Sequence, residues 1–77
     1  MTQPICMPQL SGTQTHARVV QWLCEEGQSV REGDVVIHLA THTTDIRLPA
    51  PFHGVIKEIL VDEGDRVQQG DILALLE

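Results

Sequence analysis

The chain has few aromatic residues and almost no lysine. Among 77 residues there are one Trp, one Phe and no Tyr, so any core has to be built from aliphatic side chains. Lys57 is the only lysine, and therefore the only side-chain amine. The cysteines, Cys6 and Cys24, fit neither a CxxC site nor a disulfide framework, which favours two free thiols in a reducing cytoplasm.

Long apolar runs and a basic surplus are also missing. No apolar run approaches the roughly 18 residues of a membrane-spanning helix, and no signal-peptide pattern is present, so we expect no membrane segment. The formal net charge is -6, which repels phosphate backbones and argues against nucleic-acid binding. The acidic turns around Glu26 and Glu63 are expected to be solvated.

The chain shows no pattern of a catalytic or metal site. Zinc needs three or four convergent ligands, whereas the four histidines are scattered along the chain, so we expect no bound metal. No nucleophile lies in a recognisable arrangement with a base, and no glycine-rich phosphate loop follows a strand. A non-catalytic domain is the interpretation that these absences favour.

One sequence pattern occurs twice. Residues 26–35 and 63–72 both read Glu-Gly-x-x-Val-x-x-Gly-Asp followed by an aliphatic residue, so the second copy lies 37 positions (63 minus 26) after the first. Two copies are too few for a solenoid, which needs about three or more. The repeat therefore predicts a single domain, residues 1–77, whose halves are related by a pseudo-two-fold axis.

The segments around each copy predict an all-β fold. The runs at 19–24 and 55–61 are rich in strand-forming residues, and each leads into a turn where Gly27 or Gly64 supplies a positive φ. Further strands are predicted at 35–40 and 72–76, and no stretch has the apolar spacing of a helix. Short strands at regular spacing predict a flattened barrel or sandwich of two antiparallel sheets.

The core can also be predicted from the pattern. Val30 and Val67 occupy the same place in the two copies and should be buried, as should Trp22. A third segment, 35–39, reads Val-Val-Ile-His-Leu. Simple strand alternation predicts that its first, third and fifth residues face inward, and that Val36 and His38 face outward.

The symmetry locates the midpoint of the chain. Residues 41–44 link the two halves, and the chain termini lie at the equivalent place in the other half. A two-fold axis puts the link and the termini at opposite ends of the domain. We therefore expect residues 41–44 to form an exposed β-turn.

Three segments carry a resemblance to a known family. Residues 7–13 read Met-Pro-Gln-Leu-Ser-Gly-Thr, residues 19–23 read Val-Val-Gln-Trp-Leu, and residues 48–56 read Leu-Pro-Ala-Pro-Phe-His-Gly-Val-Ile. In this order and spacing they resemble the biotinyl/lipoyl domain family. The resemblance is nearest to the lipoyl domain of the acyltransferase in a 2-oxo acid dehydrogenase complex of the pyruvate type.

The resemblance implies a cofactor position that this chain has altered. Family members attach lipoate or biotin to a lysine in the midpoint turn, and alignment on Pro49 and Gly54 puts Thr43 there, flanked by His42 and Thr44. A hydroxyl cannot form the amide that a lysine amine forms, and Lys57 falls inside a predicted strand. No cofactor is therefore expected; lipoate would be the cofactor if residue 43 were lysine.

The resemblance also implies partners. Family members interact with the dehydrogenase components of the complex and with lipoate ligase, through the midpoint turn and the loop that here comprises residues 14–17. Both regions depart from the family pattern. The isolated domain is expected to be monomeric and part of a dihydrolipoamide acyltransferase.

Two alternatives stay open. One is a stand-alone scaffold or protein-interaction module of the same fold. The other is a biotin-carrier relative, although biotin domains usually have Met on both sides of the lysine, and the Met-Pro-x-Leu-Ser start favours the lipoyl type.

Overall fold

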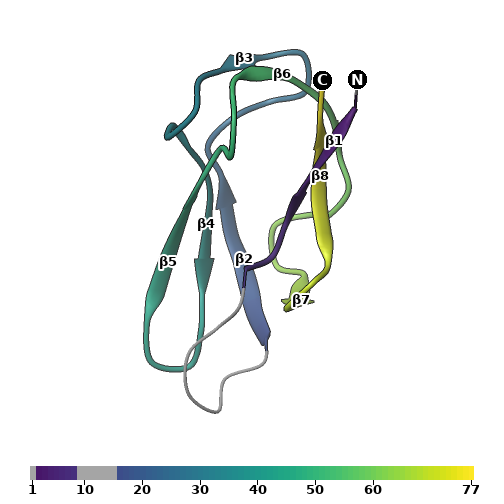
Figure 1. The fold of residues 1–77 in the computed structure, drawn as a ribbon. Helices are drawn as coiled ribbons and strands as arrows, with labels where there is room; N and C mark the ends of the chain where they lie inside the picture. The colour runs from purple at the N-terminus through teal and green to yellow at the C-terminus, as the bar shows by residue number, and fades with distance from the viewer. Residues whose placement is uncertain (1, 9–15) are drawn as a thin grey trace.

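The strands of this chain form a two-layered sandwich. A computed structural model describes residues 2–8 and 16–77, and within these ranges it contains strands and turns but no helix. The described strands are β1 (Gln3–Cys6), β2 (His16–Trp22), β3 (Ser29–Val30), β4 (Val35–Ala40), β5 (Asp45–Pro49), β6 (Gly54–Ile59), β7 (Arg66–Gln68) and β8 (Ile72–Leu76). The domain measures 34 × 19 × 17 Å. Both termini lie at one end of the long axis, and the β4–β5 hairpin points to the other (Figure 1).

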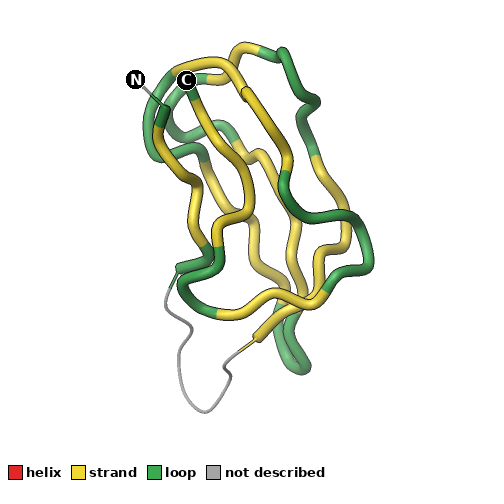
Figure 2. Tube along the Cα trace, turned by 90° about the vertical axis from the view of Figure 1, so that its right-hand side faces the viewer, coloured by secondary structure: helices red, strands yellow, loops and turns green. Residues whose placement is uncertain are grey.

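The two sheets are copies of each other. Their strand orders are β1-β8-β6-β3 and β5-β4-β2-β7, and every pairing is antiparallel. Exchanging the halves of the chain converts one order into the other. The halves also exchange their short strands: β3 pairs with β6, and β7 pairs with β2. The prediction of two antiparallel sheets with pseudo-two-fold symmetry is confirmed, and Figure 2 shows the strands in yellow, joined by loops in green, from the side.

The ladders repeat at the level of single residues. Val19 pairs with Leu39 between β2 and β4, and Ile56 pairs with Leu76 between β6 and β8. All four side chains are at most 1% exposed, so they fill the space between the sheets. Each ladder then shifts register just after Val19 or Ile56. The register shifts in the two ladders are therefore also 37 residues apart.

The predicted alternation in β4 is wrong at its first two residues. Val35 is 38% exposed, whereas Val36 and Ile37 are both fully buried. The β4–β5 ladder shifts register between Val35 and Ile37, and such a bulge interrupts the two-residue period of a strand. The same departure occurs in β8, where the adjacent Leu73 and Ala74 are both buried.

Two glycines of the repeat form turns that hydrogen-bond to the opposite half of the chain. Gly27 and Gly64 have φ of 88° and 94°, as predicted, a region that side chains rarely adopt. The Gly27 amide donates to the Ile56 carbonyl at 2.7 Å, and the Gly64 amide donates to the Val19 carbonyl at the same distance. The turn at Gly27 is thereby fixed to β6, and the turn at Gly64 is fixed to β2.

The glutamates of the repeat have a structural task that the sequence analysis missed. A Glu26 carboxylate oxygen accepts from the Ile59 amide at 2.8 Å, and a Glu63 oxygen accepts from the Trp22 amide at 3.1 Å. Both bonds reach across to the opposite half. These acidic turns are exposed, as expected, but the two carboxylates also satisfy backbone donors where β6 and β2 end.

The predicted core valines are confirmed, and Trp22 needs a correction. Val30 and Val67 are both buried. Trp22 is only partly buried and packs against the edge of the core. Its indole Nε1 donates to the Val61 carbonyl at 2.9 Å, which holds the ring near the surface where that backbone group lies.

Candidate functional site

The β4–β5 turn is held by one of its own threonines. The turn closes with the Thr41 amide donating to the Thr44 carbonyl at 2.7 Å. The Thr41 hydroxyl oxygen accepts from the Thr44 amide at 3.0 Å and from the Thr43 amide at 3.3 Å, and the hydroxyl donates to the Thr44 carbonyl at 3.1 Å. A threonine that bonds to nearby backbone in this way stabilises tight turns. The Thr41 side chain and backbone thus supply the hydrogen bonds that close the turn.

The turn presents three side chains to solvent at one end of the domain. His42, Thr43 and Thr44 are all exposed, and together with Thr41 and Asp45 they line a shallow, open hollow. This end is the one opposite the chain termini (Figure 1). The structure therefore brings together the three residues that the sequence analysis selected, on a hairpin that projects away from the chain termini.

The chemistry of this tip does not fit an amide-linked cofactor. The turn offers hydroxyls and an imidazole but no amine. The one side-chain amine lies elsewhere: the Lys57 Nζ atom, on β6, is 3.4 Å from the Thr2 hydroxyl and 3.9 Å from a Glu77 carboxylate oxygen. Both of these neighbours lie beside the chain ends. Lys57 is therefore at the far end of the domain from Thr43.

A histidine and a carboxylate meet at the base of the hairpin. The His38 Nε2 atom is 3.6 Å from an Asp45 carboxylate oxygen, a distance for ionic attraction but too long for a hydrogen bond. Within the described part of the chain, this covered nitrogen has no hydrogen-bond partner. The sequence analysis missed the pair, because only the hairpin register brings residues 38 and 45 together. No cluster of three metal-ligating side chains occurs among the described residues.

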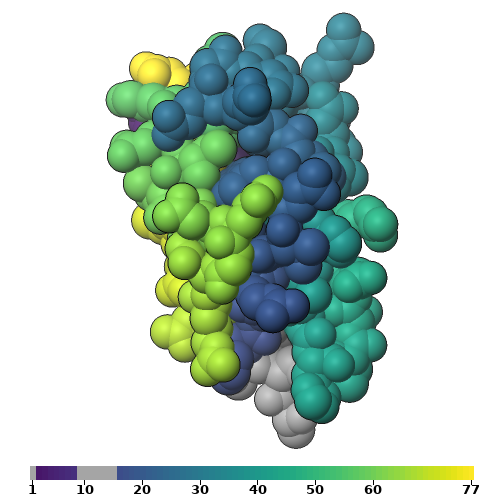
Figure 3. Space-filling view, turned by 180° about the vertical axis from the view of Figure 1, so that it is seen from behind, coloured from purple at the N-terminus to yellow at the C-terminus, as the bar shows by residue number. Residues whose placement is uncertain are grey.

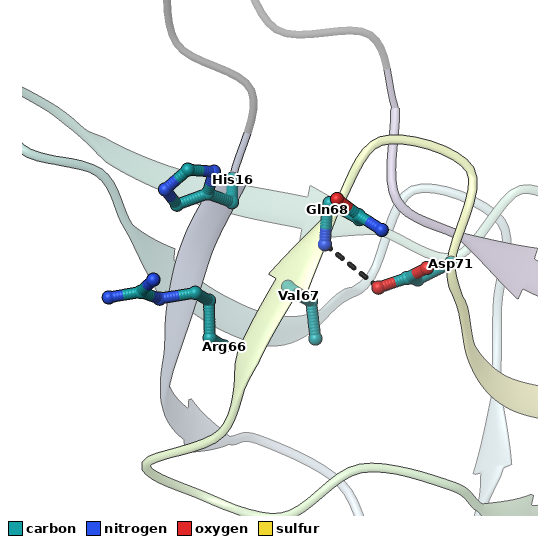
Figure 4. Close-up of a pocket in the computed structure, with 5 residues that line it drawn as sticks. All are labelled: His16, Arg66, Val67, Gln68 and Asp71. Carbon is teal, nitrogen blue, oxygen red and sulfur yellow. Dashed lines mark hydrogen bonds between the residues drawn. The ribbon is translucent and has the colours of Figure 1, made fainter.

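A second hollow lies at the β2–β7 edge. It is lined by His16, Arg66, Val67, Gln68 and Asp71. Figure 4 shows His16 and Arg66 projecting to the same side of the strand pair, whereas Asp71 lies beyond β7 and accepts a hydrogen bond from the Gln68 amide at 2.9 Å.

The altered loop of the sequence analysis is only partly described. Residues 14 and 15 lie outside the described residues, while Ala17 is buried in β2. The segment at 7–13, which carried part of the resemblance, is described only at Met7 and Pro8.

The cysteines are free thiols, as expected, but their surroundings differ. Cys6 is exposed, whereas Cys24 is buried with its Sγ atom 3.7 Å from the Val36 carbonyl oxygen. Burial raises the pKa of the Cys24 thiol, because a thiolate loses hydration there. None of the described segments forms a helix long and apolar enough to cross a membrane.

Comparison with known proteins gives consistent matches. The biotin/lipoyl family, described as "Biotin-requiring enzyme", matches residues 3–76. The chain is 33% identical to the dihydrolipoyllysine-residue succinyltransferase component of the 2-oxoglutarate dehydrogenase complex from Bacillus subtilis, over 94% of this chain and 17% of that protein. It is 34% identical to the mitochondrial pyruvate dehydrogenase protein X component of Mus musculus, over 94% of this chain and 15% of that protein. The chain thus spans less than a fifth of either relative.

Solved structures agree on the fold. The lipoyl domain of the 2-oxoglutarate dehydrogenase complex from Azotobacter vinelandii superposes with a TM-score of 0.78 at 27% identity, covering 96% of this chain and 94% of that one. Urea carboxylase from Kluyveromyces lactis superposes with a TM-score of 0.82 at 23% identity, covering 100% of this chain and 6% of that one. At that identity the second match shows the fold alone.

Proposed function

The chain belongs to the biotin/lipoyl family, and on that premise we propose that it is a lipoyl-type domain of a 2-oxo acid dehydrogenase complex that carries no lipoate. The curated relatives quoted above are components of such complexes, and the family resemblance drawn from the sequence is confirmed. The lipoyl type is favoured over the biotin type by these relatives and by the lipoyl domain among the similar structures.

The observation that carries the proposal is the separation of the hairpin tip from the amine. Thr43 occupies the tip, where the family resemblance expects the modified lysine, and its hydroxyl cannot accept lipoate or biotin as an amide. Lys57 projects from β6 at the opposite end, beside Thr2 and Glu77. A ligase that recognises a lysine on an exposed turn finds no such group there.

The domain by itself is proposed to be non-catalytic. The acyltransferase activity of a parent protein would reside in segments outside these 77 residues. The proposed partners are the dehydrogenase components of the complex, met through a tip whose histidine and threonines replace the family's acidic flank and lysine. Without an acyl-carrying arm, the domain would contribute contacts rather than acyl transfer.

Intact-mass measurement tests the proposal. The parent domain and the Thr43→Lys variant are each expressed with an active lipoate ligase and excess lipoate, and in parallel with a biotin ligase and biotin. The parent is expected to gain neither group. The variant is expected to gain one lipoyl mass and no biotin, because residues that still match the family fix the hairpin and its register.

Two outcomes would change the account. A lipoyl increment on the parent would contradict it, and peptide mapping would then identify the acceptor. A folded Thr43→Lys variant that never gains lipoate would show that the recognition surface is lost as well. That result would replace the lipoyl-type proposal with the scaffold alternative.

A further inference from the structure

Three of the five basic residues gather on the outer face of one sheet. Arg18 of β2 pairs directly with Arg66 of β7, and Arg47 of β5 pairs with His38 of β4. Their strand neighbours, such as Val19 and Val67, point into the core, so the arginines point outward. We call Arg18, Arg47 and Arg66 the arginine face. Figure 3 looks onto this side of the domain, where β7, β2 and the β4–β5 hairpin lie side by side.

The arginine face makes no ion pair with any residue that the structure describes. No hydrogen bond or ion pair joins its three guanidinium groups to any described residue, and like charges directly opposite on a sheet are destabilising. Asp45 is the one acidic residue on the same face, and it lies against His38. The nearby Glu63 and Asp71 carboxylates already accept backbone hydrogen bonds. The face therefore carries three arginines that make no ion pair with the neighbouring carboxylates, on a chain of net charge -6.

The internal symmetry shows that the fold does not need these arginines. The other sheet has the same ladders, and by the 37-residue offset its counterparts of Arg18 and Arg66 are Val55 and Ser29. His38 and Leu75 are equivalent by the same offset. Arg47 pairs with His38 and Pro4 pairs with Leu75, so Pro4 is the counterpart of Arg47. The core positions stay apolar in both halves and the turn glycines repeat, but the positive charges of the arginines do not. A role outside folding explains this difference.

We propose that the arginine face binds an acidic segment of a partner protein. Strands in a sheet lie about 4.8 Å apart, so the face crosses three strand spacings, roughly 14 Å. An extended peptide presents same-side residues about every 7 Å, so two or three of its carboxylates match this span. Arginine binds carboxylates with two parallel hydrogen bonds, which gives specificity as well as attraction.

The rest of the chain favours a short acidic protein segment over a longer polyanion. The domain is 17–19 Å thick, and charges are largely screened beyond about 8 Å at physiological salt. A segment confined to the arginine face is therefore little affected by the acidic turns elsewhere. Nucleic acid or an anionic bilayer extends past the face and meets those turns.

The binding test uses a decaglutamate peptide and amide chemical shifts of the labelled domain. At about 0.15 M salt, where the acidic turns elsewhere on the domain are screened, shifts are expected to concentrate on β2, β4, β5 and β7. The Arg18→Gln/Arg66→Gln double variant should bind about 4- to 25-fold more weakly, since each exposed pair contributes a factor of about two to five.

The matched control is Arg31→Gln. It removes one positive charge, as each of the two changes in the double variant does, from an exposed turn away from the arginine face, and should leave affinity within about two-fold. Equal melting temperatures of all variants show that folding is intact.

Three results would overturn the proposal. The first is an absence of peptide-induced shifts on the arginine face. The second is an equal loss of affinity in Arg31→Gln and the double variant. The third is tighter binding of decathymidylate or phosphatidylserine vesicles than of decaglutamate, which would assign the face to nucleic acid or to a membrane surface.

Discussion

The two halves of this domain agree where they pack and differ where they meet solvent. Val19 and Ile56, and Leu39 and Leu76, are buried equivalents in equivalent ladders. On the outer sheet faces the halves diverge, with arginines on one side only. Packing therefore keeps equivalent positions apolar in both halves, whereas the outer faces, where charge differs between the halves, are where function is to be sought.

The ends of the domain differ in the same way. At one end residues 41–44 close β4 onto β5. At the equivalent end of the other half, β8 ends at Leu76 and β1 begins at Gln3, and the Lys57 amine lies 3.4 Å from the Thr2 hydroxyl and 3.9 Å from a Glu77 carboxylate oxygen. The tip of the β4–β5 hairpin therefore carries no side-chain amine, and the Lys57 amine lies at the opposite end of the domain.

The largest expected effect comes from breaking the shared core. Leu39→Ala and Leu76→Ala each remove a fully buried side chain and leave a cavity, which typically costs about 2–5 kcal/mol. Equivalent positions should cost similar amounts in urea unfolding. Val35→Ala, at an exposed site, is the control and should change stability by less than about 0.5 kcal/mol. Costs that differ several-fold between the two leucines would contradict energetic equivalence of the halves.

A second prediction concerns a pair of equivalent positions where one half has alanine and the other has glycine. Gly54 is the counterpart of Ala17, but a Cβ at Gly54 would lie 2.8 Å from the Glu77 carbonyl oxygen and 3.2 Å from Leu76. Gly54→Ala should therefore destabilise the domain by about 1–3 kcal/mol, the usual range for overpacking. The reverse change, Ala17→Gly, should cost about 1 kcal/mol through backbone entropy. A thermal melt in which Gly54→Ala is stabilising would refute the close approach.

A third prediction tests the glutamates that join the halves. Glu26→Ala and Glu63→Ala should each cost about 0.5–1.5 kcal/mol, because each removes the acceptor of a backbone amide. Glu26→Gln keeps a carbonyl acceptor and should cost less. Faster hydrogen exchange at the Ile59 amide in Glu26→Ala, but not in Glu63→Ala, would localise the effect. Unchanged exchange at both amides would show that the bonds do not form.

The smallest expected effect is a difference in reactivity between the thiols of Cys6 and Cys24. Cys6 should react with a disulfide reagent at once, whereas Cys24 should react only as the domain unfolds. The raised pKa of Cys24 means that its thiol form stabilises the fold below the ordinary value of 9.0, and that this contribution is lost as pH rises past the folded value. Unfolding of Cys6→Ser measured as the pH rises above the ordinary value of 9.0 should show the loss, and Cys24→Ala should lack it. Rapid labelling of Cys24 at neutral pH would contradict its burial.

Much of the fold is predictable because the same sequence pattern occurs in both halves of the chain. The paired glycines indicate the positive-φ turns, and the paired valines indicate burial at Val30 and Val67. The bulge in β4 is not predictable from alternation, since Val35 and Val36 are equally apolar and only the ladder shows which one leaves the core. The partial exposure of Trp22 likewise depends on where the Val61 carbonyl lies.

The site is predictable in part for the same reason. Symmetry places residues 41–44 at a tip, and the sequence shows directly that no lysine is there. The His38–Asp45 contact and the arginine face depend on cross-strand register, which brings residues far apart in sequence onto one surface. Period-two patterns assign a side chain to a face but not to its neighbours.

The most direct test of the central claim is a lysine scan of the tip, read by intact mass after expression with lipoate ligase. His42→Lys, Thr43→Lys and Thr44→Lys each place one amine on the same exposed turn, one residue apart. The account predicts a lipoyl increment on Thr43→Lys alone, and none on the parent. Lipoylation of the parent, or equal lipoylation of all three variants, would contradict the claim that residue 43 holds the acceptor position and that the chain has lost its acceptor.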